Sequence, residues 1–206
     1  MKKTIITISR QYASGGRQIG EKLAKSLGIS VYDKELISLA AKQSGFSEKV
    51  FENVDKQSAN SLLYSLSTGM YNAIGHFDGA NNLPLNDKVF LVQYNVIRDL
   101  AQKESCVIVG RCADYVLRDN PDVIHVFIHS DMKSRIRRAV EEYGMVPDHA
   151  ESMILKGDKR RAAYYDFYTG MKWGRVENYD LTIDSDSIGL DNAAKLIEDY
   201  TRMRQE

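Results

Sequence analysis

The fold is decided by residues 4–20, which read TIITISRQYASGGRQIG. Residues 4–8 are β-branched, and a short run of this kind predicts a buried β-strand. The run breaks at residues 10–16, the glycine loop, which ends in two adjacent glycines. Beyond the loop, apolar residues recur at the spacing of one helix face: Ile19, Leu23, Ala24 and Leu27. Because Gly28 is suited to end this helix, residues 4–28 predict a strand, a tight loop and a helix in direct succession.

A glycine loop between a strand and a helix N-terminus forms a cradle for phosphate. The free N–H groups of the first helical turn attract an anion, and glycine lets the backbone approach it closely. The usual phosphate loop reads G-x-x-x-x-G-K-[ST]. Here Arg10 stands in place of the first glycine, Gly15 matches the second, and Gly16 replaces the lysine. Arg17 replaces the Ser or Thr, so an ordinary strand-to-helix turn is an equally good interpretation of the loop alone.

Four further apolar runs predict strands, at residues 29–32, 106–109, 123–128 and 181–183. Helical patterns cover residues 33–41, 84–103 and 190–203, and another helix follows Ser130. Asp33 and Ser130 are suited to cap the helices that they precede. Short apolar strands that alternate with helices predict one α/β domain, in which helices cover both faces of a parallel sheet.

The composition is that of an ordinary globular protein. Lysine and arginine number 28, and aspartate and glutamate also number 28, so no global charge recruits nucleic acid or a membrane. Cys106 and Cys112 lie in or beside an apolar run, which favours buried reduced thiols. The first apolar run ends at Ile8, too soon for a signal peptide or a membrane span. We expect a cytoplasmic protein, and we leave homo-oligomerisation open.

Several blocks of the chain resemble the cytidylate kinase-like family. They are ISRQYASGGRQIG at 8–20, VYDKELI at 31–37, VIVGRCAD at 107–114, DKRRAAYY at 158–165, and WG at 173–174 followed by NYDLTIDS at 178–185. The blocks come in the same order over nearly the whole chain. The resemblance implies a three-layer P-loop NTPase-type fold, with about five parallel strands flanked by helices and a helical lid. It also implies ATP and Mg²⁺ as cofactors and a small-molecule nucleotide such as CMP as acceptor.

Two segments of the single domain, residues 1–206, receive special roles. Residues 56–84 are rich in serine, asparagine and glycine, and we interpret them as a mobile segment on the acceptor side. Residues 145–174 resemble the lid of nucleoside monophosphate kinases. In this lid Lys159, Arg160 and Arg161 would bring positive charge to the transition state, although exposed residues of a helix surface are the alternative.

The resemblance assigns the donor phosphate to the glycine loop and to the first turn of the following helix: Arg10, Ala13, Ser14, Gly15, Gly16, Arg17 and Gln18. Because the lysine is missing, Arg10 or Arg17 would supply its charge, and Arg17 would share in catalysis. A solvated helix residue is the alternative for Arg17. Ser14, or else Ser9, would bind Mg²⁺.

Arg111, which follows the third strand, matches a position that binds the acceptor phosphate in cytidylate kinases. A salt bridge with Asp114 is its alternative. Asp33 and Lys34 follow the second strand and would lie at the same edge of the sheet, where parallel α/β sheets bind ligands. Asp33 could instead cap its helix.

The leading hypothesis is ATP-dependent phosphoryl transfer to a nucleoside monophosphate. A nucleotide sensor that kept the fold but lost catalysis is the main alternative, and a kinase for another small molecule is the third. Of the three arginines at positions 135, 137 and 138, at most one or two can face the site, and Arg138 is the one favoured. For Tyr164, Tyr165, Tyr168 and Trp173, packing of the lid is favoured over stacking on a base.

Overall fold

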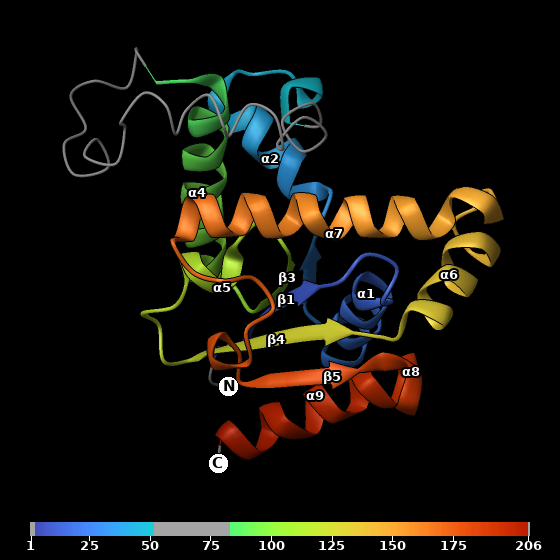
Figure 1. The fold of residues 1–206 in the computed structure, drawn as a ribbon. Coiled ribbons are helices and arrows are strands. Elements are labelled where there is room, and N and C mark those ends of the chain that lie inside the picture. The colour runs from blue at the N-terminus through green and yellow to red at the C-terminus, as the bar shows by residue number, and fades with distance from the viewer. Residues whose placement is uncertain (1–2, 52–82, 206) are drawn as a thin grey trace.

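The computed structural model describes residues 3–51 and 83–205, which contain one parallel sheet (Figure 1). Its five strands are β1 (Ile5–Arg10), β2 (Ser30–Tyr32), β3 (Cys106–Val109), β4 (Val123–His129) and β5 (Leu181–Asp184). They lie in the order β2-β3-β1-β4-β5, and every neighbouring pair is parallel. The predicted five-stranded parallel sheet is confirmed. All five strands therefore end at the same edge, where the glycine loop begins.

Helices cover both faces of the sheet, as a three-layer α/β fold requires. On one face lie α1 (Gly16–Leu27) and α9 (Leu190–Gln205), and on the other lie α2 (Glu35–Ser44), α4 (Leu85–Lys103) and the short α5 (Ala113–Val116). Strand β1 packs against the helices on both faces of the sheet because its successive side chains point to opposite faces. Ile6 and Ile8 pack with α1 and α9, whereas Ile5 packs with α2 and α4.

The segment predicted as a lid is mainly the long helix α7 (Pro147–Thr169), which follows α6 (Met132–Glu141). Figure 1 shows α7 running from α6 to the side of α4. At its far end Tyr168 stacks on Phe90 of α4, with ring centroids 4.2 Å apart, and its hydroxyl donates to Asp87. No helix of the described chain, α7 included, is long and apolar enough to cross a membrane.

Two further short elements are the 3₁₀ helix Val176–Asn178 and the helix α8 (Ser185–Ile188). The thiols of Cys106 and Cys112 are buried, as predicted, and burial raises the pKa of Cys106 to about 12. Of the predicted segment 56–84, residues 56–82 lie outside the described residues.

Two predicted helix caps are wrong. The cap of α6 is Asp131, whose side chain accepts a hydrogen bond from the Ser134 amide, so Ser130 does not have this role. The α2 helix begins after Lys34 without a side-chain cap. Asp33 instead lies 3.6 Å from Arg10 and 3.5 Å from Arg17, because two guanidinium groups attract its carboxylate more strongly than helix amides do.

Candidate phosphate-transfer site

The glycine loop is held in shape by hydrogen bonds from buried hydroxyl groups. Ser14 is fully buried, and its Oγ donates to the carbonyl oxygens of Gln11 and Ile128, at 2.9 and 3.1 Å. Ser185 Oγ in turn donates to the Ser14 carbonyl at 2.6 Å. Residues Ala13 and Gly15 both have positive φ, +57° and +81°, so the chain turns sharply into α1.

The amides at the start of α1 are available to an anion. The backbone N–H groups of Gly15, Gly16 and Arg17 form no hydrogen bond within the part of the chain that the structure describes. Such unpaired N–H groups at a helix N-terminus bind phosphate well. The loop therefore offers three free amides at the position where the phosphate cradle was predicted.

The hydroxyl of Ser14, which was predicted to bind Mg²⁺, does not suit this role. Because the Ser14 hydroxyl is buried and bonded to two carbonyls, we do not retain it as a metal ligand. Residues 3–51 and 83–205 contain no group of three or more His, Cys, Asp or Glu side chains that could hold a metal ion. A magnesium ion would instead be held mainly by the phosphates of the bound nucleotide, as is common for this ion.

A cavity of about 630 Å³ lies beside the glycine loop, at the carboxyl edge of the sheet. We call it the basic cavity because five cationic side chains line it: Arg10, Lys34, Arg111, Arg160 and Arg161. Two acidic residues, Asp33 and Glu48, accompany them. The basic residues come from four separate places, namely the end of β1, the β2–α2 turn, the end of β3 and α7. The three predicted acceptor residues, Asp33, Lys34 and Arg111, thus meet in one cavity.

Positive charge is crowded at one point of this cavity. Arg161 Nη1 donates to the carbonyl oxygen of Arg10 at 3.1 Å, and its guanidinium carbon lies 5.1 Å from the ring centre of Tyr12. Burial and the neighbouring charge of Arg10 lower the pKa of Arg161 to about 9. An anion bound between the two guanidinium groups would relieve this repulsion.

The turn after β3 has a strained backbone. Three successive residues have left-handed φ values: Gly110 at +75°, Arg111 at +60° and Cys112 at +54°. Only the first of them is a glycine, and non-glycine residues in this region cost free energy. Strained backbone of this kind is concentrated at functional sites, and here it carries Arg111 into the lining of the basic cavity.

The buried carboxylate of Asp114 holds two residues of the cavity wall in place, and the sequence prediction missed this role. Asp114 accepts hydrogen bonds from Ser9 Oγ at 3.3 Å and from the Tyr165 hydroxyl at 2.8 Å. Burial raises its pKa, although these hydrogen bonds partly oppose the shift. Since Ser9 and Tyr165 line the cavity, Asp114 fixes two of its walls. The order G-R-C-A-D was visible in the sequence, but nothing in it indicated these partners.

Some predicted catalytic and donor residues lie away from the cavity. Arg17 Nε donates to Glu21 at 2.8 Å, and its side chain is 46% exposed. Lys159 is exposed on α7, and Gln18 Nε2 donates to Glu142 at 2.7 Å. None of these three residues lines the basic cavity, whereas Arg160 and Arg161 do.

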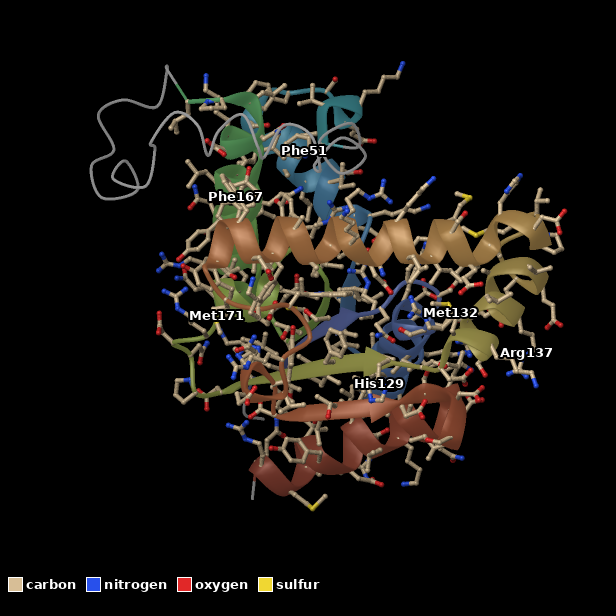
Figure 2. All side chains as sticks on the ribbon, in the orientation of Figure 1. Phe51, His129, Met132, Arg137, Phe167 and Met171 are labelled. Carbon is tan, nitrogen blue, oxygen red and sulfur yellow. The ribbon has the colours of Figure 1, made fainter. Side chains whose placement is uncertain are left out.

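Helices α6 and α7 bind the glycine loop through Asp158 and Arg135, which the sequence prediction missed, and through Arg138, which it favoured. Asp158 Oδ1 accepts from the Tyr12 amide at 2.7 Å, and Asp158 also pairs with Arg135. Arg135 Nε donates to the Tyr12 carbonyl at 2.8 Å, and Arg138 Nη1 donates to the Ala13 carbonyl at 2.9 Å. Arg135 and Arg138 are three positions apart and therefore share a helix face. Arg137 lies on another face and points outward (Figure 2).

The aromatic residues pack α7 against the core, as predicted. Tyr165 is buried with Phe90, and Tyr164 and Tyr168 pack against them. Trp173 meets Phe127 edge to face, with ring centroids 5.4 Å apart. Tyr164, Tyr165 and Trp173 also form part of the cavity wall.

The sheet order, the glycine loop and the helix over it define the class of P-loop kinase folds. The model of the cytidylate kinase-like family matches residues 5–187, and the chain belongs to this family. Among solved structures, an uncharacterized protein from Eubacterium ventriosum is 30% identical, with a TM-score of 0.70. That match covers 97% of this chain and 99% of the other.

More distant structures agree on the fold. A shikimate kinase from Bacteroides thetaiotaomicron is 11% identical, with a TM-score of 0.57, and the match covers 97% of this chain and 98% of that one. A shikimate kinase from Acinetobacter baumannii, solved with shikimate, is 13% identical, with a TM-score of 0.53 and coverage of 98% and 95%. No curated protein sequence matches the chain. Family and fold are thus those of kinase-type phosphotransferases.

Proposed function

We propose that the protein transfers a phosphoryl group from ATP to a small phosphorylated acceptor, specifically a nucleoside monophosphate such as CMP. The observation that carries the proposal is the basic cavity, which is lined by five cationic and two acidic side chains and shares Arg10 with the glycine loop. Five positive charges against two negative ones leave a local excess of positive charge, which suits an acceptor that carries its own phosphate. Phosphoryl transfer needs positioning and positive charge rather than covalent help, and this arrangement provides both.

In this proposal the donor and acceptor phosphates meet at the glycine loop. The amides of Gly15, Gly16 and Arg17 bind a donor phosphate, while Arg111 and Lys34 bind the phosphate of the acceptor. Arg160 and Arg161, from α7, and Arg10, from β1, line the same cavity and would stabilise the charge of the transferring group. Magnesium, carried by the nucleotide, neutralises phosphate charge.

A nucleotide sensor of the same fold is the second candidate. It is favoured by Gly16 in place of the lysine and by Arg17, which pairs with Glu21 outside the cavity. A sensor binds nucleotide without turnover and has no need of a charged transition-state site.

The two candidates are separated by ADP release from Mg²⁺-ATP with a panel of nucleoside monophosphates. We expect release that depends on one pyrimidine monophosphate and falls at least about 100-fold in Arg160→Ala and Arg161→Ala, because each removes charge from the transition state. ATP binding by calorimetry with no release for any acceptor would favour the sensor. No ATP binding would contradict both candidates.

A further inference from the structure

The side chain of Arg10 runs between two glycines that are distant in sequence. A Cβ atom at position 16 would lie 2.6 Å from Arg10 Cβ and 3.0 Å from its Cγ. A Cβ atom at position 110 would lie 2.0 Å from Arg10 Nη1 and 3.0 Å from its Cζ. The arginine stem therefore lies against Gly16, and its guanidinium lies against Gly110.

The close contact at position 16 is not one that can relax easily. The nearest clashing atom is Arg10 Cβ, which is fixed by the β1 backbone and cannot move away as the end of a flexible side chain can. On the other side of the same space lies Ile128 Cβ, 3.4 Å from the added atom. Gly16 is the first residue of α1, where most residues other than glycine would be favoured, so the glycine needs a local reason.

The guanidinium of Arg10 is directed at the basic cavity. It lines that cavity and lies 3.6 Å from Asp33, at the acceptor side of the glycine loop. In the usual phosphate loop a glycine occupies the first position and a lysine follows the second glycine. In this chain the charge starts from the first position, and the glycine stands where the lysine belongs.

We propose that Arg10 and Gly16 have exchanged the roles of glycine and lysine in the phosphate loop. The Arg10 stem occupies the space of a side chain at position 16, and its guanidinium brings the positive charge to the transferring phosphoryl group. The charge assignment rests on the proposed kinase function. The packing assignment does not, because it concerns the folded chain alone.

The packing assignment predicts that Gly16→Ala changes Tm in opposite directions in the wild-type and Arg10→Gly chains. In the wild-type chain, Gly16→Ala should lower Tm by about 3–10 °C, because the added methyl group overpacks the Arg10 stem. In an Arg10→Gly chain the same change should raise Tm by about 1–3 °C, since alanine is the better helix residue and the space is empty. An Arg10→Ala chain keeps the clashing Cβ and should not show the rescue.

Gly20→Ala is the matched control, because its neighbours are Val109 and Ile8 rather than Arg10. Its effect on Tm should be the same in both backgrounds. Equal effects of Gly16→Ala in both backgrounds would overturn the proposal. If Arg10→Gly does not fold, the packing assignment is still tested by Gly16→Ala in the wild-type chain. A Tm of this variant at or above that of wild type would overturn the proposal.

The charge assignment is tested by Mg²⁺-ATP binding in calorimetry. Gly16→Lys alone should bind at least about 10-fold more weakly than wild type, and the double change Arg10→Gly/Gly16→Lys should return to within about threefold. Wild-type affinity in the single variant, or no recovery in the double variant, would overturn the exchange. Absence of ATP binding in wild type would overturn the charge assignment together with the proposed function, while the Tm reversal would still decide the packing.

Discussion

Arg111 holds a left-handed backbone that costs a non-glycine residue about 1–2 kcal/mol. Cys112 adjoins it in the same conformation, at φ +54°, so the turn after β3 stores strain at two successive positions. A glycine would be the stable choice for either position. Arg111 is instead retained at the wall of the basic cavity, where its charge contributes to the proposed acceptor site.

This strain can be separated from the function of the side chain. Arg111→Gly and Arg111→Ala both remove the guanidinium, so we expect both to lose acceptor binding to the same extent. Only glycine relieves the strain of the positive φ. The free energy of unfolding should therefore be about 0.5–1 kcal/mol higher for Arg111→Gly than for Arg111→Ala. Urea denaturation measures this difference. Equal stability of the two variants would show that the turn is not strained.

The lowered pKa of Arg161 gives a pH dependence of known sign. An unfolded arginine stays protonated well above pH 9, whereas in the fold the pKa is about 9. Above pH 9 the unfolded chain therefore binds more protons, and the contribution of Arg161 to stability rises with pH. Phosphate binding should change in the opposite direction, because the neutral side chain no longer attracts an anion.

We accordingly expect inorganic phosphate to raise Tm at pH 7.5 and to have a much smaller effect at pH 10. Arg161→Gln should lose most of the phosphate effect already at pH 7.5. The control is Lys159→Gln on the exposed face of the same helix, which should keep it. A phosphate effect that is equal in all three proteins would place anion binding elsewhere.

The sequence predicted a residue's place in the site only where that residue directly follows a strand. Asp33, Lys34 and Arg111 come directly after strands, and parallel strands end at one edge, so their meeting in one cavity could be predicted. The role of Asp158 could not be predicted, because it depends on how far α7 lies from the loop. The same holds for Asp114, whose partners come from β1 and α7.

The α6–α7 pair is the element that completes the site. It brings Asp158 and Arg161 from α7 and Arg135 from α6 onto the backbone of the glycine loop. Close packing reinforces these bonds, because a Cβ atom at Gly157 would lie 2.8 Å from the Tyr12 ring. The backbone of the glycine loop is thus held by these two helices as well as by its own hydrogen bonds.

Asp158→Asn tests this coupling between elements. The side chain of Arg135 is only 5% exposed, and the substitution leaves its charge buried without a carboxylate. We expect the free energy of unfolding to fall by about 3 kcal/mol, as is typical when a buried pair is broken. Glu151→Gln, at an exposed position of the same helix, should change it by less than about 0.5 kcal/mol. Equal effects in urea denaturation would contradict the role of Asp158.

Elements with a clear period were predicted to within a few residues. The third strand was predicted with its observed bounds, Cys106–Val109, and the predicted helix 84–103 is α4, Leu85–Lys103. Helix caps were less predictable because several nearby residues can fill the same role. Asp33 had the chemistry of a cap, but Arg10 and Arg17 compete for its carboxylate, and these contacts depend on the whole fold.

For the molecule as a whole, charge is balanced overall but unequal in its distribution. The chain carries 28 basic and 28 acidic residues, yet five basic residues and two acidic ones line the cavity. A local excess of this kind concentrates positive potential at the cavity while the chain as a whole stays neutral. The family is that of cytidylate kinase-like proteins, the fold is that of P-loop kinases, and the proposed acceptor carries a phosphate.

The most direct test of that acceptor is ³¹P NMR of the protein with Mg²⁺-ATP and the nucleoside monophosphate panel. Transfer to a phosphate forms a phosphoanhydride, so we expect the acceptor signal to be replaced by the coupled signals of a nucleoside diphosphate, together with ADP. Formation of ADP with inorganic phosphate alone, or ATP that stays unchanged with every acceptor, would contradict the proposed phosphoryl transfer.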